Sequence, residues 1–176
     1  MGDPNANGST DAPCETTGLT QKQKDAILTS WNLVRQPDAK TFKQHGVDFF
    51  LKFFAENPSY QDLFSKLKGM SAEELKDSPK LKAHATIVMY NISTIVDNLN
   101  DPETLVELLK KVGHDHQPRH VTPAHFETLA TVFLEFIGEK LGSHLDAFAK
   151  ESWSSAFKVI NAVVKQSIEA RVQESA

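Results

Sequence analysis

Apolar side chains recur every three or four residues along most of the chain. In each segment they fall on one face of a helix of about 3.6 residues per turn, and no stretch shows the alternation of a half-buried strand. We therefore predict an all-α fold. The stripes are Ile27, Trp31 and Val34; Phe42, Phe49, Phe50, Phe53 and Phe54; Leu81, His84, Val88, Ile92, Ile95 and Leu99; Leu105, Leu108, Leu109 and Val112; Phe126, Leu129, Phe133, Ile137 and Leu141; and Trp153, Phe157, Ile160, Val164 and Ile168.

Helix-start signals separate these stripes. A capping side chain directly before a proline predicts a start, because the cap accepts from a free backbone N–H and proline lacks one at the first helical position. Such pairs are Ser78-Pro79, Asp101-Pro102 and Thr122-Pro123; Gln36-Pro37 and Asn57-Pro58 mark two more starts, Thr20 with Gln23 resembles a capping box, and Gly142-Ser143 breaks the helical pattern. No repeat at solenoid periods occurs, so we expect a single helical domain.

Composition changes sharply near the start of the chain. Residues 1–19 are mostly Asn, Gly, Ser, Thr, Asp and Pro, and they offer too little apolar surface to offset the entropy of ordering. We expect a disordered tail over residues 1–19, a domain over residues 20–172 and a short tail over residues 173–176. No apolar stretch is long enough to span a membrane, and no secretory signal occurs near the start.

The charge balance narrows the classes of partner. The 176 residues carry 19 Lys and Arg against 23 Asp and Glu, a net charge of −4, which gives no footprint for nucleic acid. The single cysteine, Cys14, cannot form an intrachain disulfide, as expected in a reducing compartment. We expect a cytoplasmic protein that is a monomer or weak homodimer.

Two of the seven histidines lie where a core residue is expected. His84 lies on the apolar stripe of its helix; alone, such a histidine is more often a hydrogen-bonded core residue than a ligand. His116 lies four residues after Val112 on the same face, and Pro118 should end that helix within a residue or two. His114 lies on a different face, so it is the weaker candidate ligand.

The remaining histidines have plainer interpretations. His116 and His120 have the spacing of a helical metal pair, but Pro118 interrupts the helix between them and no carboxylate motif completes a zinc site. We expect His45, His125 and His144 to be structural or exposed. No nucleophilic triad, phosphate-binding glycine loop or pair of catalytic carboxylates is present, so hydrolytic and nucleotide chemistry have no basis in the sequence.

The order of residues resembles the globin family, in particular intracellular globins of the cytoglobin and neuroglobin type, as an invertebrate form. The resemblance covers roughly residues 19–171. It is carried by Trp31 in the first helix; by Gly46, Phe50, Phe54 and Pro58 in the second; by Phe64; by Ser78-Pro79 through His84, Ala85 and Val88; and by Val112-Gly113-His114-Asp115-His116 followed by Val121 and Phe126. It implies a globin fold with three helices packed over three around a haem, and a close helix crossing at Gly46 and Ala85.

The resemblance implies haem b, iron protoporphyrin IX, between proximal His116 and distal His84, the two residues assigned to the metal. The implied haem-binding set is Phe50, Phe64, Leu67, His84, Val88, Val112, His116, Arg119, Val121, Phe126 and Leu129. A neutral imidazole that ligates iron should donate its other ring N–H to a fixed acceptor, for which the carbonyl of Val112 is suited. Arg119 or His120 could pair with the haem propionates, and the guanidinium matches carboxylate geometry better.

We expect a protein that binds oxygen, carbon monoxide and nitric oxide at the iron, for oxygen transport or storage or for another role. The connection between Phe64 and His84 contains Gly69, Met70 and Ser71, and we expect it to be mobile enough for His84 to bind the iron directly. The alternatives are a nitric oxide dioxygenase or peroxidase-like enzyme with a reductase partner, a haem-based redox or gas sensor, and a pentacoordinate storage globin.

Overall fold

The computed structural model describes residues 11–174, and these residues contain no strand. Seven α-helices and three short 3-10 helices account for most of them. The elements are α1 (Gln21–Arg35), α2 (Ala39–Glu56), η1 (Pro58–Leu63), α3 (Ala72–Asp77), α4 (Pro79–Asp97), α5 (Pro102–His116), η2 (Gln117–Arg119), α6 (Pro123–Leu141), η3 (Gly142–His144) and α7 (Ala147–Glu174). The all-α prediction is confirmed.

The predicted caps form at four helix starts. The Ser78 side chain accepts from the Leu81 N–H at 3.3 Å, and Asp101 accepts from the Thr104 N–H at 3.1 Å. Capping boxes close the starts of α1 and α6. The two weaker signals are displaced: α2 begins at Ala39 because Asp38, not the residue before Pro37, caps it, and Pro58 opens a 3-10 helix.

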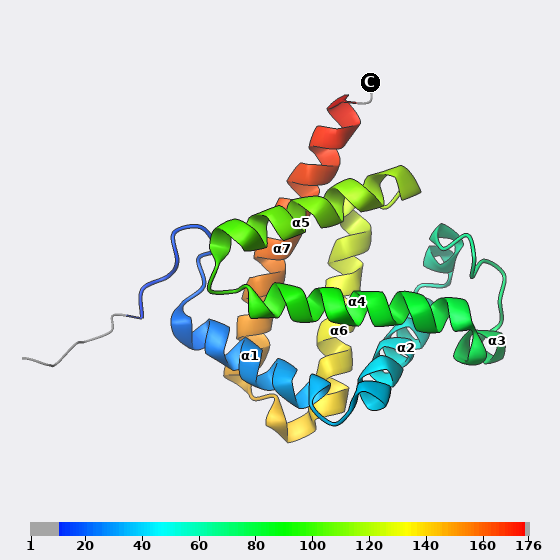
Figure 1. Ribbon diagram of the computed structural model, residues 1–176, viewed down its shortest axis with the longest axis horizontal. Coiled ribbons are helices and arrows are strands. Elements are labelled where there is room, and N and C mark those ends of the chain that lie inside the picture. The colour runs from blue at the N-terminus through cyan, green and yellow to red at the C-terminus, as the bar shows by residue number, and fades with distance from the viewer. Residues whose placement is uncertain (1–10, 175–176) are drawn as a thin grey trace, which may run out of the picture.

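The helices form two crossing layers. Figure 1 shows α1, α4 and α5 lying across α6 and α7, and α2 packs against both α4 and α6. The predicted close crossing is present: a Cβ built on Gly46 would lie 3.0 Å from the Ala85 carbonyl oxygen and 3.2 Å from the Ala85 Cβ. This contact fixes α2 against α4, the helix that carries His84.

Two buried indoles tie α1 to its neighbours. Trp31 donates to the Ser93 hydroxyl on α4 at 3.0 Å, and Trp153 on α7 donates to the Ser30 hydroxyl at 2.8 Å. Both tryptophans are at most 2% exposed. Each indole N–H therefore has the partner that a buried donor requires.

The packed structure begins earlier than residue 20. Leu19 is 2% exposed and belongs to the core, and its carbonyl accepts from the Cys14 N–H at 2.9 Å. The expectation of a tail over residues 1–19 therefore fails for the last of these residues, because one apolar side chain reaches the core from a polar segment. At the other end α7 runs to Glu174. Residues 1–10 and 175–176 of the expected tails lie outside the described residues.

Among the described helices, none combines the length and apolar character that crossing a membrane would need.

Candidate functional site

The end of α5 presents His116 with a defined ring orientation. Its Nδ1 lies 2.7 Å from the carbonyl oxygen of Val112, one turn earlier on the same helix. A carbonyl oxygen only accepts, so Nδ1 must carry the proton and Nε2 keeps its lone pair. The predicted hydrogen bond to Val112 is confirmed, and it leaves Nε2 as the nitrogen able to bind a metal.

Pro118 ends α5 where the sequence predicts. The helix stops at His116, and residues 117–119 form the short turn η2. The turn closes at His120, which adopts the left-handed conformation with φ of 60°. Arg119 is exposed and donates to the carbonyl oxygen of Asp115, so the structure gives this guanidinium a backbone partner at the end of the helix.

His84 lies on α4 among aromatic rings. Its imidazole centroid is 5.0 Å from the ring of Phe50 and 5.1 Å from that of Phe64, both nearly perpendicular to it. The ring of Phe64 also lies 5.0 Å from Phe54, which the implied haem-binding set omits. Phe54 follows Phe50 by four residues on the same helix face, so helical spacing alone could have identified it.

Electrostatics connect the two imidazoles. Burial is the main cause that lowers the pKa of His84 to about 4, and repulsion from a protonated His116 and from Arg119 contributes to the same shift. Burial also lowers the pKa of His116, against the hydrogen bond to Val112. Both rings are therefore neutral at pH 7, which is the protonation state that binds a metal.

The other expected haem contacts differ in burial, and one of them lies against His116. The ring of Phe126 on α6 lies 5.2 Å from that of His116. Phe50 and Leu67 are buried, at 1% and 2% exposure. The half-buried members are Phe64, Val88, Val112, Val121, Phe126 and Leu129, and Arg119 is exposed.

The donor set fits a metal that brings most of its own ligands. Among residues 11–174, no group of three or more His, Cys, Asp or Glu side chains is arranged to hold a metal ion. A bare transition metal needs about four donors, whereas a porphyrin supplies four ring nitrogens and leaves only axial positions to the protein. The two neutral imidazoles with aromatic and aliphatic neighbours match that second case.

The other histidines have different partners. His114 is exposed and contacts Arg171 and Asp115, so its ring lies on a different face of α5 from that of His116. His45 Nδ1 lies 3.2 Å from the Val34 carbonyl oxygen. His125 accepts from the Thr122 N–H at 2.9 Å in the capping box of α6.

Relatives and solved structures agree on one family. The globin family profile matches residues 47–164, more than half of the chain. The chain is 32% identical to cytoglobin-1 of Oryzias latipes over 149 residues, which covers 84% of this chain and 82% of that protein.

The fold matches solved globin structures. A crystal structure described as a hexacoordinated heme protein from an anhydrobiotic tardigrade matches with a TM-score of 0.78 at 18% identity, covering 87% of this chain and 97% of that one. Ferric myoglobin of Aplysia limacina matches with a TM-score of 0.76 at 23% identity, covering 85% and 98%. The predicted three-over-three arrangement is thus confirmed, and the chain belongs to the globin family.

Proposed function

We propose that this globin holds haem b between His116 and His84 and binds diatomic gases there. The observation that carries the proposal is the pair of neutral, half-buried imidazoles at α4 and α5, one of them oriented by the Val112 carbonyl. A haem iron would supply a coordination position that takes up oxygen, carbon monoxide or nitric oxide. The protein would supply the proximal ligand, the distal group and a surrounding that excludes water.

The lining assigned to the haem is mostly apolar. In this proposal Phe50, Phe64, Leu67 and Val88 would line its distal side, and Val112, Val121, Phe126 and Leu129 would line its proximal side. Aromatic and aliphatic side chains around the iron keep water away, which slows loss of an electron from the ferrous form. Arg119 is the proposed propionate partner. Its positive charge lowers the pKa of both imidazoles. Its guanidinium donates one N–H to the Asp115 carbonyl and can bind a carboxylate with its other N–H groups.

His84 is the proposed sixth ligand when no gas is bound. No hydrogen bond joins its ring to another described residue, because its neighbours are the rings of Phe50 and Phe64. None of the described residues therefore competes with iron for its nitrogen lone pair. A bound His84 lowers the apparent gas affinity by the fraction of protein in which the position is open, which argues against simple storage.

Two conditions accompany this function. Gas binding requires ferrous iron, so the proposal includes a reductase as a partner. We place the activity in the cytoplasm, in a monomer or weak homodimer, because Cys14, the single cysteine of the chain, suits a reducing compartment.

Replacing His116 tests the proximal assignment. We expect His116→Ala to lose haem on gel filtration, because no other donor faces the iron from α5. His114→Ala is the matched control, since His114 lies two residues away and is exposed. If His116→Ala keeps a full complement of haem while His114→Ala loses it, the assignment is wrong.

Replacing His84 tests the distal assignment. We expect His84→Leu to give a five-coordinate ferrous form and faster association of carbon monoxide, measured by flash photolysis, because the internal competitor is gone. His144→Leu, at an exposed position, should leave the rate unchanged. Equal rates in His84→Leu and the unaltered protein would refute direct binding by His84.

A further inference from the structure

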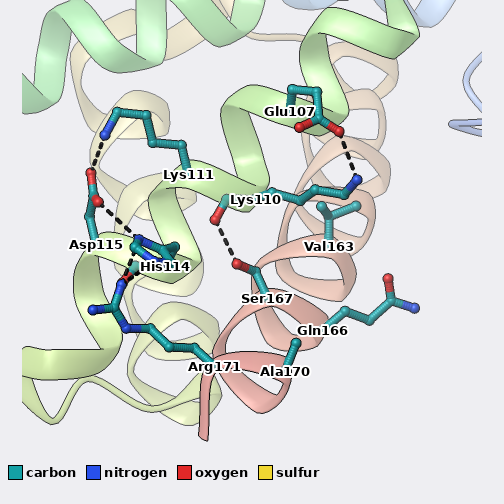
Figure 2. Close-up of a pocket in the computed structure, with 10 residues that line it drawn as sticks. All are labelled: Glu107, Lys110, Lys111, His114, Asp115, Val163, Gln166, Ser167, Ala170 and Arg171. Carbon is teal, nitrogen blue, oxygen red and sulfur yellow. Dashed lines mark hydrogen bonds and ion pairs between the residues drawn. The ribbon is translucent and has the colours of Figure 1, made fainter. Parts of the chain in front are cut away.

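The last third of α7 is bonded to the backbone of the helix that carries His116. Figure 2 shows Ser167 and Arg171 reaching from α7 toward the end of α5. The Ser167 hydroxyl donates to the carbonyl oxygen of Lys110 at 2.6 Å, and Arg171 Nη1 donates to that of His114 at 2.9 Å. The same guanidinium lies against the His114 ring.

The hydrogen bond from Arg171 takes the place of a backbone hydrogen bond that Pro118 prevents. In a continuing helix the carbonyl of His114 would accept from the backbone N–H of residue 118. Residue 118 is proline, which has no N–H. The guanidinium of Arg171 fills this position from another helix, so the final turn of α5 is completed by α7.

Helices α5 and α7 approach each other closely at Gly113. A Cβ built on Gly113 would lie 2.7 Å from both the Val164 carbonyl oxygen and the Ser167 Cβ. The backbone of α5 therefore rests directly on α7 between the two hydrogen bonds. The ring of His116 is hydrogen-bonded to the carbonyl of Val112. The α5 backbone that packs against α7 therefore also orients this ring.

Ser167 and Arg171 act on a different face of α5 from the ligand. Successive residues of a helix are turned by about 100°, so Lys110 and His114 lie on one side and Val112 and His116 on another. Neither Ser167 nor Arg171 is placed to touch a haem. Their effect on the iron would pass through the helix backbone.

We propose that Arg171 and Ser167 are positioning residues that set the orientation of the His116 imidazole toward the iron. This inference rests on the proposed function, since it concerns how the proximal ligand is held. Without the bond from Arg171, the exposed carbonyl of His114 bonds to water instead, the final turn of α5 loses this tie to α7 and frays, and the ring of His116 samples several orientations. The strength of the iron–imidazole bond then varies among molecules.

The test uses the haem-loaded protein carrying His84→Leu, so that His116 is the only protein ligand. The iron–imidazole stretching band of the ferrous form is measured by resonance Raman spectroscopy. Arg171→Met should shift and broaden this band, and Arg171→Lys, whose ammonium can donate to the same carbonyl, should restore most of its position. Ser167→Ala, a mild substitution within a helix, should give a smaller change in the same direction.

Lys111→Met is the matched control. Lys111 lines the pocket between α5 and α7 that Ser167 and Arg171 also line, and it too carries a positive charge, but its ion pair with Asp115 lies within α5 (Figure 2). It should leave the band unchanged. The inference is overturned if the band is unchanged in both Arg171→Met and Ser167→Ala, or if Lys111→Met shifts it equally. Either result leaves the proposed haem binding unaffected. Failure of the parent protein to hold haem refutes the proposed function itself.

Discussion

Gly113 offers a direct measure of how tightly α5 rests on α7. In Gly113→Ala the new methyl group would meet the Val164 carbonyl oxygen at 2.7 Å. That atom is backbone, so the clash cannot be relieved by turning a side chain, and the helices must separate. Gly138 on α6 is the matched control, because a Cβ there would meet nothing within 4 Å.

Two opposing terms decide the sign for Gly113→Ala. Alanine is favoured over glycine inside a helix by about 1 kcal/mol. Overpacking a close contact costs about 1 to 3 kcal/mol. Because a backbone atom must move, we expect the cost to dominate and the free energy of unfolding to fall by about 1 kcal/mol or more. Gly138→Ala has only the first term and should be stabilising by about 0.5 to 1 kcal/mol.

Urea unfolding followed by circular dichroism measures both variants, compared in the same haem-bound state so that ligand linkage does not differ. At this chain length, each kcal/mol corresponds to a shift of about 2 to 4 °C in Tm, which gives a second reading. If Gly113→Ala is stabilised as much as Gly138→Ala, with the same dependence on urea, then α5 and α7 are not in close contact at this glycine.

Three further outcomes follow from the packing and the pKa of His84. Leu19→Ala should lower the free energy of unfolding by about 2 to 4 kcal/mol in urea titrations, since it opens a cavity in the core, while Leu33→Ala, at a side chain 43% exposed, should change it by no more than about 1 kcal/mol. Ser30→Ala leaves the buried N–H of Trp153 without its acceptor and should cost about 1 to 3 kcal/mol by the same assay; no loss would mean that another acceptor replaces it. The pKa of His84 is about 4 in the folded protein against an ordinary 6.5, so the unfolded chain binds more protons between these two pH values. The free energy of unfolding of the haem-free protein should therefore be full above pH 6.5 and fall toward pH 4, and it should fall less steeply in His84→Leu. Identical pH profiles of the two proteins would refute this.

Features that depend on neighbouring residues were predictable from the sequence. The caps at Ser78 and Asp101, the stop at Pro118 and the bond from His116 to Val112 each join groups within about one helical turn. Helical spacing fixes such geometry before any tertiary contact forms. The two histidines of the candidate site could be identified for the same reason, with the globin resemblance supplying their roles.

Features that depend on the register between distant helices were not predictable. The bond from Arg171 to the His114 carbonyl spans 57 positions, and that from Trp153 to Ser30 spans 123. Nothing local marks Arg171 as a partner of α5, because its neighbours in sequence are ordinary helix residues. The burial of Leu19 was missed because a polar segment was judged by its average composition, whereas one side chain is enough to reach the core.

The visible absorption spectrum of the haem-reconstituted protein tests the central claim most directly. It is recorded in the ferric form, then after reduction without oxygen, then with carbon monoxide. Sharp, split bands in the gas-free ferrous form are the predicted result and mean that His84 and His116 both bind the iron. A single broad band that sharpens only with carbon monoxide would contradict direct binding by His84 and return oxygen storage to first place.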